Sequence, residues 1–359
     1  MTPLDQTMRR VLALPREAGT PAGVTARDIV AEHLEALGYR VERQRFSFFP
    51  SSLDGFPVFG AGVGALALLV LPLLAGARAP AWAAALLLAA GLAALTLAAL
   101  GIGLGRLRLG GAPREDANLI ATRGGAPVRR WVVAHLDTKA QAQSMAGRLV
   151  AVWVIGLAVA ALAALALLRF WGAVPLPLAG GAMLLAVAAG ALAGGSRLRG
   201  TSQGARDNGT GVAAALAAAE RSNDAGTGIL ITGAEEFGLV GARVFVAQAG
   251  ERLRDAVVVN LDTIDQEGDL ALVSHDGRGA ELARRESPGL AAAGLVARLR
   301  RLPAGILTDS VPFARAGVPA ITIGRLTWRT LRTIHTPRDT PDRLSLETAE
   351  RVGRALAAN

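Results

Sequence analysis

Five side chains that can bind a metal ion lie on well-separated segments of this chain: His135, Asp207, Glu236, Asp262 and His335. Imidazoles and carboxylates together form a ligand set that zinc accepts. A carboxylate at Asp207, in the glycine-bounded turn 204–211, can reach two ions about 3.5–4 Å apart. Glu235 and Glu236 are adjacent and should diverge, so one can bind metal while the other takes a proton from a shared water. The pattern predicts a two-metal hydrolytic centre with a built-in base.

The position of these residues favours one shared site. His135, Glu235, Glu236 and Asp262 each fall at the carboxyl end of a predicted strand, and ligands bind at that edge of open α/β sheets. A single acidic residue there can simply cap a helix or pair with an arginine, but this explanation does not extend easily to the whole set. Asp137 lies two residues after His135, on the same side of an extended strand, and can accept the second imidazole N–H.

The elements that must position these residues alternate between strands and helices. Side-chain alternation predicts a strand at 40–48, and apolar runs predict strands at 117–122, 130–134, 228–232, 255–261, 269–273 and 319–323. Helical spacing predicts helices at about 26–37, 212–221, 240–248 and 345–357, the first starting at a capping box formed by Thr25 and Asp28. This alternation predicts an α/β fold with a mixed, largely parallel sheet flanked by helices.

Four long stretches without any charged residue interrupt this polar part: 55–77, 79–105, 149–168 and 170–196. Each meets the roughly 20 residues that a helix needs to cross about 30 Å of hydrocarbon, whereas buried helices of a soluble core seldom lack charge for so long. Very short links near Arg78 and Arg169 join them into two hairpins. The small-residue pairs Gly60/Gly64 and Gly101/Gly105 have a spacing that permits close helix approach.

Composition agrees with a membrane protein and argues against other classes. The chain is 52% hydrophobic and only 19% charged, which is too apolar for an ordinary soluble enzyme. The net charge of +9 is almost entirely scattered arginine, and Lys139 is the only lysine, so a nucleic-acid surface is not expected. Cysteine is absent, which excludes disulfides and thiolate metal sites. The first residues lack the apolar core of a signal peptide.

Arginines set the expected orientation. Each hairpin leaves and returns to the same side, and that side carries flanking arginines at 106, 108, 148, 197 and 199. The positive-inside rule then places the polar domain in the cytoplasm of a multi-pass protein, which we expect in the bacterial cell membrane. The short tethers 138–147 and 197–206 hold His135 and Asp207 within roughly 40 Å of the bilayer. We therefore expect membrane-proximal peptides as substrates and the lipid bilayer as a partner.

Six separated blocks of the polar domain resemble the M28 family of zinc metallopeptidases: 134–138, 204–208 with Gly211, 235–241, 260–262, Asp309 with 312–313 and 317–319, and 335–340. The resemblance implies that His135 and Asp262 bind one zinc, that Glu236 and His335 bind the other, and that Asp207 bridges the two Zn²⁺ ions. It also implies Glu235 as the general base and Asp137 as an orienting carboxylate. The implied activity is that of a membrane-embedded aminopeptidase or exopeptidase that attacks peptide bonds with metal-bound hydroxide.

With this resemblance, the peptidase domain covers residues 1–54, 106–147 and 197–359, and transmembrane hairpins are inserted at 55–105 and 148–196. Two positions depart from the family pattern. Arg206 replaces a residue that is commonly acidic, where it can alter metal affinity or contact a substrate carboxylate, and Thr308-Asp309-Ser310 replaces Ser-Asp-His. His33 is expected to be a surface or structural histidine rather than a ligand, and His275 to be structural or exposed.

Other functions stay open at this point. A catalytically silent membrane scaffold has no need of the clustered carboxylates, and a transporter would require charged residues within the spans. A glutaminyl-cyclase-like acyl transfer is possible on a related fold, although the full second set of ligands favours hydrolysis. Substrate preference, the metal actually bound and the oligomeric state are not specified by the sequence.

Overall fold

The computed structural model describes residues 2–302 and 306–357, and the chain forms two compact units. The sheet unit comprises Met1–Phe48, Pro113–Ala140 and Gly200–Asn359, and the helical unit comprises Phe49–Ala112 and Gln141–Arg199. The hairpins expected at 55–105 and 148–196 fall within the helical unit. Every potential metal ligand predicted from the sequence belongs to the sheet unit.

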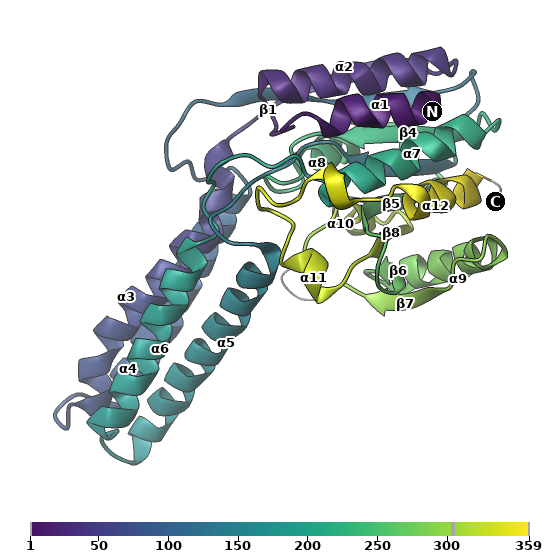
Figure 1. The fold of residues 1–359 in the computed structure, drawn as a ribbon. Helices are drawn as coiled ribbons and strands as arrows, with labels where there is room; N and C mark the ends of the chain where they lie inside the picture. The colour runs from purple at the N-terminus through teal and green to yellow at the C-terminus, as the bar shows by residue number, and fades with distance from the viewer. Residues whose placement is uncertain (1, 303–305, 358–359) are drawn as a thin grey trace. The chain divides into compact units, whose positions relative to one another are not determined.

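The described residues of the sheet unit form one eight-stranded mixed sheet (Figure 1). Its strands, in spatial order, are β1 (Arg40–Phe48), β2 (Arg114–Thr122), β4 (Thr227–Thr232), β3 (Arg130–His135), β5 (Val257–Ile264), β8 (Ala320–Arg325), β6 (Leu270–Ser274) and β7 (Ala297–Arg301). The central strands β4, β3, β5 and β8 are mutually parallel, while β1 and β2 on one side and β6 on the other run antiparallel to a neighbour. The predicted mixed, largely parallel sheet is confirmed.

Helices cover both faces of this sheet. They are α1 (Pro3–Leu12), α2 (Pro21–Ala36), α7 (Thr210–Arg221), α8 (Val240–Ala249), α9 (Gly277–Ala292), α10 (Ser310–Arg315) and α12 (Glu347–Ala357), and the same unit also contains the short helix α11 (Trp328–Leu331). One face packs against α1, α2, α7, α9 and α12, and the other against α8 and α10. Val132 faces the first core and Val133 the second, because successive strand side chains point to opposite faces. Burial on both faces explains the continuous apolar run of β3.

The start of α2 differs from the prediction. The helix begins at Pro21 with Thr20 as its N-cap, whose hydroxyl accepts the N–H of Gly23 at 3.2 Å. The capping box predicted at Thr25 is therefore wrong, and the Thr25 hydroxyl donates to the carbonyl of Pro21 at 3.0 Å. Proline at the first helical position is pre-organised for this earlier start.

The structure also contains elements that the sequence reading missed. Helix α1 has buried Leu4, Met8 and Val11 on one face, with Asp5 and Arg9 outside that buried set. Its buried apolar face and exposed charges are those of an amphipathic surface helix. Helix α9 and strand β7 were missed as well, and β7 is a largely exposed, arginine-rich edge strand.

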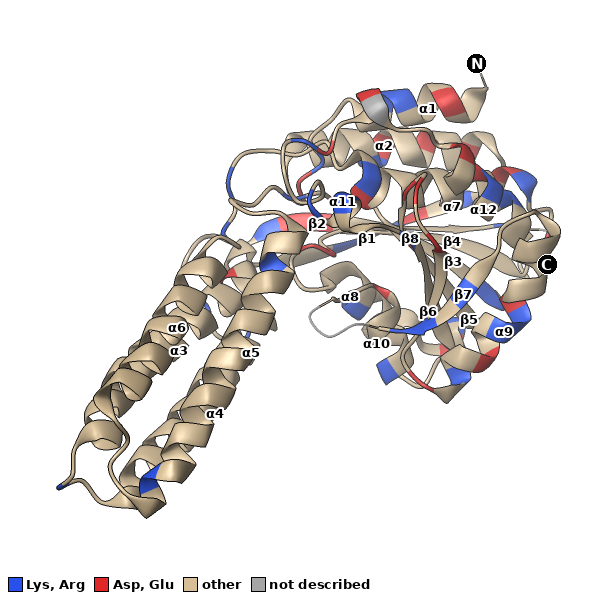
Figure 2. Cartoon of the chain, turned by 60° about the horizontal axis from the view of Figure 1, so that its bottom comes forward, with Lys and Arg blue, Asp and Glu red and all other residues tan. Residues whose placement is uncertain are grey.

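Among the described residues, four helices are long and apolar enough to cross a membrane. They are α3 (Gly55–Ala75), α4 (Ala81–Gly103), α5 (Met145–Leu168) and α6 (Leu176–Gly194). Apart from Arg148 near the start of α5, their sequences carry no charged residue. Figure 2 accordingly shows these helices almost entirely in tan. The four expected apolar helices are thus present by length and composition.

Glycines let α3 and α6 approach closely. A Cβ atom on Gly60 would lie 2.3 Å from the Cβ of Ala193, and one on Gly190 would lie 2.7 Å from the carbonyl oxygen of Gly60. This agrees with the close approach predicted for the Gly60/Gly64 pair. The pair Gly101/Gly105 does not do the same, because Gly101 faces Leu107 just beyond its own helix and Gly105 lies past the helix end.

We expect Gly190→Val to destabilise the helical unit by about 1–3 kcal/mol, because the added side chain overpacks a backbone contact. Gly156→Val is the matched control, since Gly156 is also helical and a Cβ there would meet nothing within 4 Å. Thermal unfolding in detergent, followed by circular dichroism, measures both. Equal loss of stability in the two variants would contradict the role of the glycine contact.

Candidate metal centre

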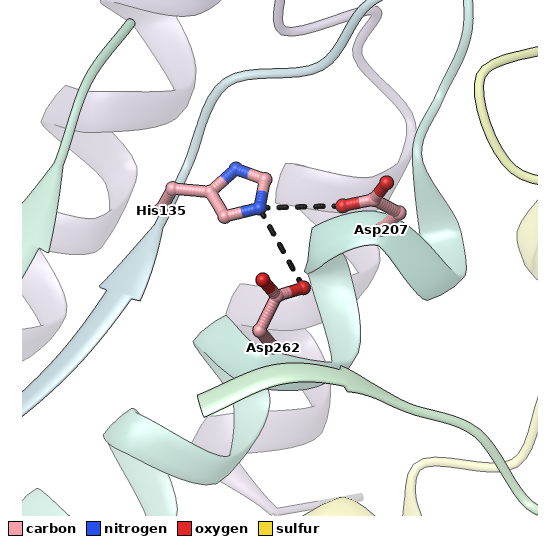
Figure 3. A group of neighbouring side chains, drawn as sticks. All are labelled: His135, Asp207 and Asp262. Atoms are coloured by element: carbon pink, nitrogen blue, oxygen red, sulfur yellow. Dashed lines mark ion pairs between the residues drawn. The ribbon is translucent and has the colours of Figure 1, made fainter. Parts of the chain in front are cut away.

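All five predicted ligands meet at the carboxyl edge of the central strands. The Nε2 atom of His135, the last residue of β3, lies 3.2 Å from Oδ1 of Asp207 and 3.9 Å from Oδ1 of Asp262 (Figure 3). The Nε2 atom of His335 lies 3.0 Å from Oδ2 of Asp207 and 3.4 Å from Oε2 of Glu236. The five residues form two groups of three, and within each group the ligand atoms lie within 4.8 Å of one another.

We call these groups the first triad (His135, Asp207 and Asp262) and the second triad (Asp207, Glu236 and His335). They share Asp207, and its two carboxylate oxygens face different imidazoles. Four of the five side chains are buried and Asp262 is half-buried. The arrangement suits one carboxylate between two ions, the role that the sequence predicts for Asp207.

Asp137 supports the site in a different way from the one expected. Its carboxylate accepts the backbone N–H groups of Glu235 and Glu236, at 3.0 and 3.1 Å. The Nδ1 atom of His135 instead contacts the backbone carbonyl of Asp137 at 3.1 Å, and the carboxylate is 3.7 Å away. Strand β3 ends at His135, so the expected alternation does not reach Asp137. Asp137 therefore orients the imidazole of His135 with its backbone carbonyl, and it holds the backbone of Glu235 and Glu236 with its side chain.

Two further residues hold the loop that carries Asp207. The carboxylate of Asp339 accepts the N–H groups of Arg206 and Asp207, at 2.9 and 3.1 Å. The fully buried guanidinium of Arg16 donates to the carbonyls of Leu136 (2.8 Å), Gln203 (2.5 Å) and Gly204 (3.0 Å). Arg16 thus ties the segment after His135 to the segment before Asp207. Sequence reasoning missed both roles, and only the block 335–340 pointed towards Asp339.

Comparisons with known proteins agree with this architecture. The family model described as Peptidase family M28 matches residues 186–359, which include Asp207, Glu236, Asp262 and His335. No curated protein matches the sequence. Among solved structures, the zinc aminopeptidase BSAP from Bacillus subtilis is similar, with 17% identity and a TM-score of 0.59, over 99% of this chain and 93% of that one.

Two more structures show the same fold. An aminopeptidase from Aneurinibacillus sp. strain AM-1 has 16% identity and a TM-score of 0.57, over 98% of this chain and 92% of that one. A glutaminyl cyclase from Fimbriiglobus ruber has 18% identity and a TM-score of 0.56, over 99% of this chain and 95% of that one. This chain has the aminopeptidase-like M28 peptidase fold. At these identities the likeness shows the fold and leaves open which of the two activities applies.

The departures from the M28 pattern have structural consequences. Arg206 pairs with Asp265 (3.1 Å) and Asp339 (3.5 Å), so protein carboxylates already engage its guanidinium. The buried Ser310 hydroxyl lies 2.6 Å from Nε2 of His275, within a network that also contains the Thr322 hydroxyl at 2.6 Å. His275 is half-buried and hydrogen-bonded, which is compatible with the expected structural role. His33 is buried too and contacts the Thr7 hydroxyl at 3.0 Å.

The centre of the M28 fold concentrates negative charge. Burial raises the pKa of Glu235 well above its ordinary value, and Glu236 and Asp309 raise it further. Burial also raises the pKa of Asp262 to about 6 and that of Asp309 to about 7. Burial opposes ionisation of Asp207 as well, but hydrogen bonds from His135 and His335 keep its pKa well below the ordinary value. Divalent cations would offset this crowding of carboxylates.

The donor atoms also fit metal ions. Both triads combine imidazole nitrogen with carboxylate oxygen, the mixture that zinc accepts. Oε1 of Glu236 and Nδ1 of His335 are buried without a hydrogen-bond partner among the described residues. Oδ1 of Asp309 is in the same condition, while its Oδ2 accepts the hydroxyl of Thr232. A further feature distinguishes the second triad, the ammonium group of Lys139 beside Glu236.

Proposed function

We propose that this chain is a zinc-dependent aminopeptidase with ligands for two ions. The observation that carries the proposal is the pair of triads sharing Asp207, with Glu235 beside the second of them. This arrangement supports the roles predicted from the sequence: His135 and Asp262 for one ion, Glu236 and His335 for the other, and Asp207 between them. Intact ligands and an intact base count against a catalytically silent scaffold.

Divalent ions held by the two triads would polarise the scissile carbonyl and lower the pKa of a water. Glu235 takes the proton of the attacking water and passes it to the departing amine. Its raised pKa, caused first by burial, suits a carboxylate that must hold a proton during the reaction. Asp137 fixes the backbone of Glu235 and Glu236 together, so that the base and the ligand keep one relative position.

The direct test measures metal content and hydrolysis on the same purified sample. Aminoacyl reporter substrates and short peptides with free N-termini should be cleaved, activity should disappear after chelation, and added zinc should restore it. Full activity in protein shown to be metal-free would refute the proposal. Equal cleavage of N-terminally blocked peptides would show a peptidase that is not an aminopeptidase.

Glutaminyl-cyclase-like acyl transfer is the second candidate, because a glutaminyl cyclase shares this fold with comparable similarity. A peptide that begins with glutamine separates the two activities. An aminopeptidase releases free glutamine, whereas a cyclase releases ammonia and leaves an N-terminal pyroglutamate. The complete second triad supports hydrolysis, and product analysis by mass spectrometry decides between them.

We also propose that α3–α6 span a bacterial cell membrane as two hairpins, with the peptidase domain in the cytoplasm. The five arginines that flank the spans on one side outnumber the two at the hairpin tips, and backbone carbonyls hold one of these two. Arg169 is buried and donates to the carbonyls of Leu73 (3.1 Å), Gly76 (2.7 Å) and Ala79 (2.7 Å). Arg78 is then the exposed tip arginine, so the charge bias favours the cytoplasmic side for residues flanking the spans.

Tags show the orientation directly. After Asn359, a reporter that works only in the cytoplasm should be active, and one that works only outside the cytoplasm should be inactive. A reactive group introduced at position 78 should be labelled from outside intact cells. A C-terminal tag reached from the external face would refute this orientation. Membrane-proximal peptides stay the predicted substrates, on the strength of the short tethers to the second hairpin.

A further inference from the structure

Lys139, the only lysine in the chain, lies inside the proposed metal centre. Its side chain is buried, and Nζ is 2.5 Å from Oε2 of Glu236. The same oxygen lies 3.4 Å from Nε2 of His335, so it belongs to the second triad. A buried ammonium thus contacts an atom that is also positioned to bind an ion.

Among the described residues, no lysine or arginine forms an equivalent ion pair with the first triad. Within the part of the chain that the structure describes, no ion pair joins a lysine or arginine to Asp207 or Asp262. Arg16, the buried cation on that side, donates to three backbone carbonyls instead. The two triads therefore offer similar donor atoms in different electrostatic surroundings.

This difference should weaken ion binding at the second triad in either of two arrangements. If an ion were to bind Oε2 of Glu236, it would share that oxygen with the ammonium of Lys139, and burial would leave the repulsion between the two positive charges poorly screened. If the ion binds Oε1, which has no hydrogen-bond partner, the ammonium still neutralises the carboxylate that should attract the ion. Asp262, the carboxylate that only the first triad contains, has no ion pair with a lysine or arginine among the described residues.

We propose that Lys139 makes the two metal sites unequal: an ion binds tightly at the first triad and weakly at the second, and the ammonium sets the difference. The proposal rests on the metal-dependent function proposed above and deepens it. The protein would hold one ion when zinc is scarce and reach the two-zinc state only at higher concentration. Lys139 is in this view a determinant of metal stoichiometry.

Lys139→Met tests this, because methionine has a similar length and no charge. Metal-free full-length protein is titrated with zinc against a competing chelator, and the two dissociation constants are fitted. We expect wild-type constants separated by at least about 100-fold, and in Lys139→Met at least about 10-fold tighter binding at the weaker site. Lys139→Arg keeps the charge and should keep the gap, while Lys139→Gln is a second neutral variant. Circular dichroism confirms that each variant is folded.

Ligand variants assign the two constants. Asp262→Asn should remove the tight site of the wild-type protein, and Glu236→Gln should leave it. Unchanged or weaker binding at the second site in both neutral variants would overturn the proposal, because Lys139 would then only hold Glu236 in place. Wild-type sites of equal affinity would overturn it too. If the difference between the two dissociation constants changes as expected but the two-zinc protein cleaves no peptide, the aminopeptidase proposal fails and the proposal for Lys139 stands.

Discussion

Glu235→Gln should lower the rate of peptide hydrolysis by about 10²–10⁴-fold while the metal content stays at the wild-type value. Glutamine keeps the size of the side chain and the backbone N–H that donates to Asp137, but its amide cannot take a proton from water. Glu235 lies outside both triads, so the substitution deletes a base and no ligand. The effect should fall on kcat, because the base acts in the chemical step.

Steady-state kinetics and metal analysis on the same preparation measure this effect. Glu236→Gln is the control. It also replaces a glutamate carboxylate with an amide, at the adjacent position, but it should weaken ion binding at the second triad. Hydrolysis by Glu235→Gln within a few-fold of the wild-type rate would remove Glu235 from its role. Loss of metal in that variant would instead make it a ligand.

Asp207→Ala should lose both ions, because the two triads have this one residue in common. Its oxygens lie 3.2 Å from His135 Nε2 and 3.0 Å from His335 Nε2, so removing the carboxylate deprives each ion of a ligand and of negative charge. We expect at least about 100-fold weaker zinc binding at both sites, and loss of hydrolysis with it.

Asp265→Ala is a suitable control for this variant. Asp265 is also a buried carboxylate near the centre, where it pairs with Arg206 and accepts the Thr330 hydroxyl, but it belongs to neither triad. Zinc titration of both proteins compares a shared ligand with a supporting residue. Two tightly bound zinc ions in Asp207→Ala would be decisive evidence against a bridging role.

Local patterns in the sequence account for the architecture of the sheet unit. The apolar runs of β3 and β5 are continuous because helices cover both faces of the sheet, and that run is visible without coordinates. The four apolar helices follow from length and absence of charge alone. Boundaries were harder to predict, since Thr20 and Thr25 are both plausible caps and Pro21 favours the earlier start.

The candidate ligands could be identified from residue type and position, because the carboxyl ends of parallel strands meet at one edge. Their distances could not. His135 and His335 are 200 positions apart in the sequence, and only the folded chain places both imidazoles against Asp207. The partners of Asp137 also lay beyond local reasoning, since strand β3 ends before it and its carboxylate turns to backbone amides nearly 100 residues away.

The sequence by itself determined the fold class, the apolar helices and the identity of the candidate metal ligands, because periodicity, composition and ligand chemistry are local properties. The tertiary structure decided which groups share a charge environment. In the sequence, Lys139 is notable only as the single lysine of an arginine-rich chain. In the fold, the parallel strands β3 and β4 are adjacent, so the segments that follow them lie together and the ammonium of Lys139 contacts Glu236. Electrostatic interaction depends on distance in space, and a sequence records only distance along the chain.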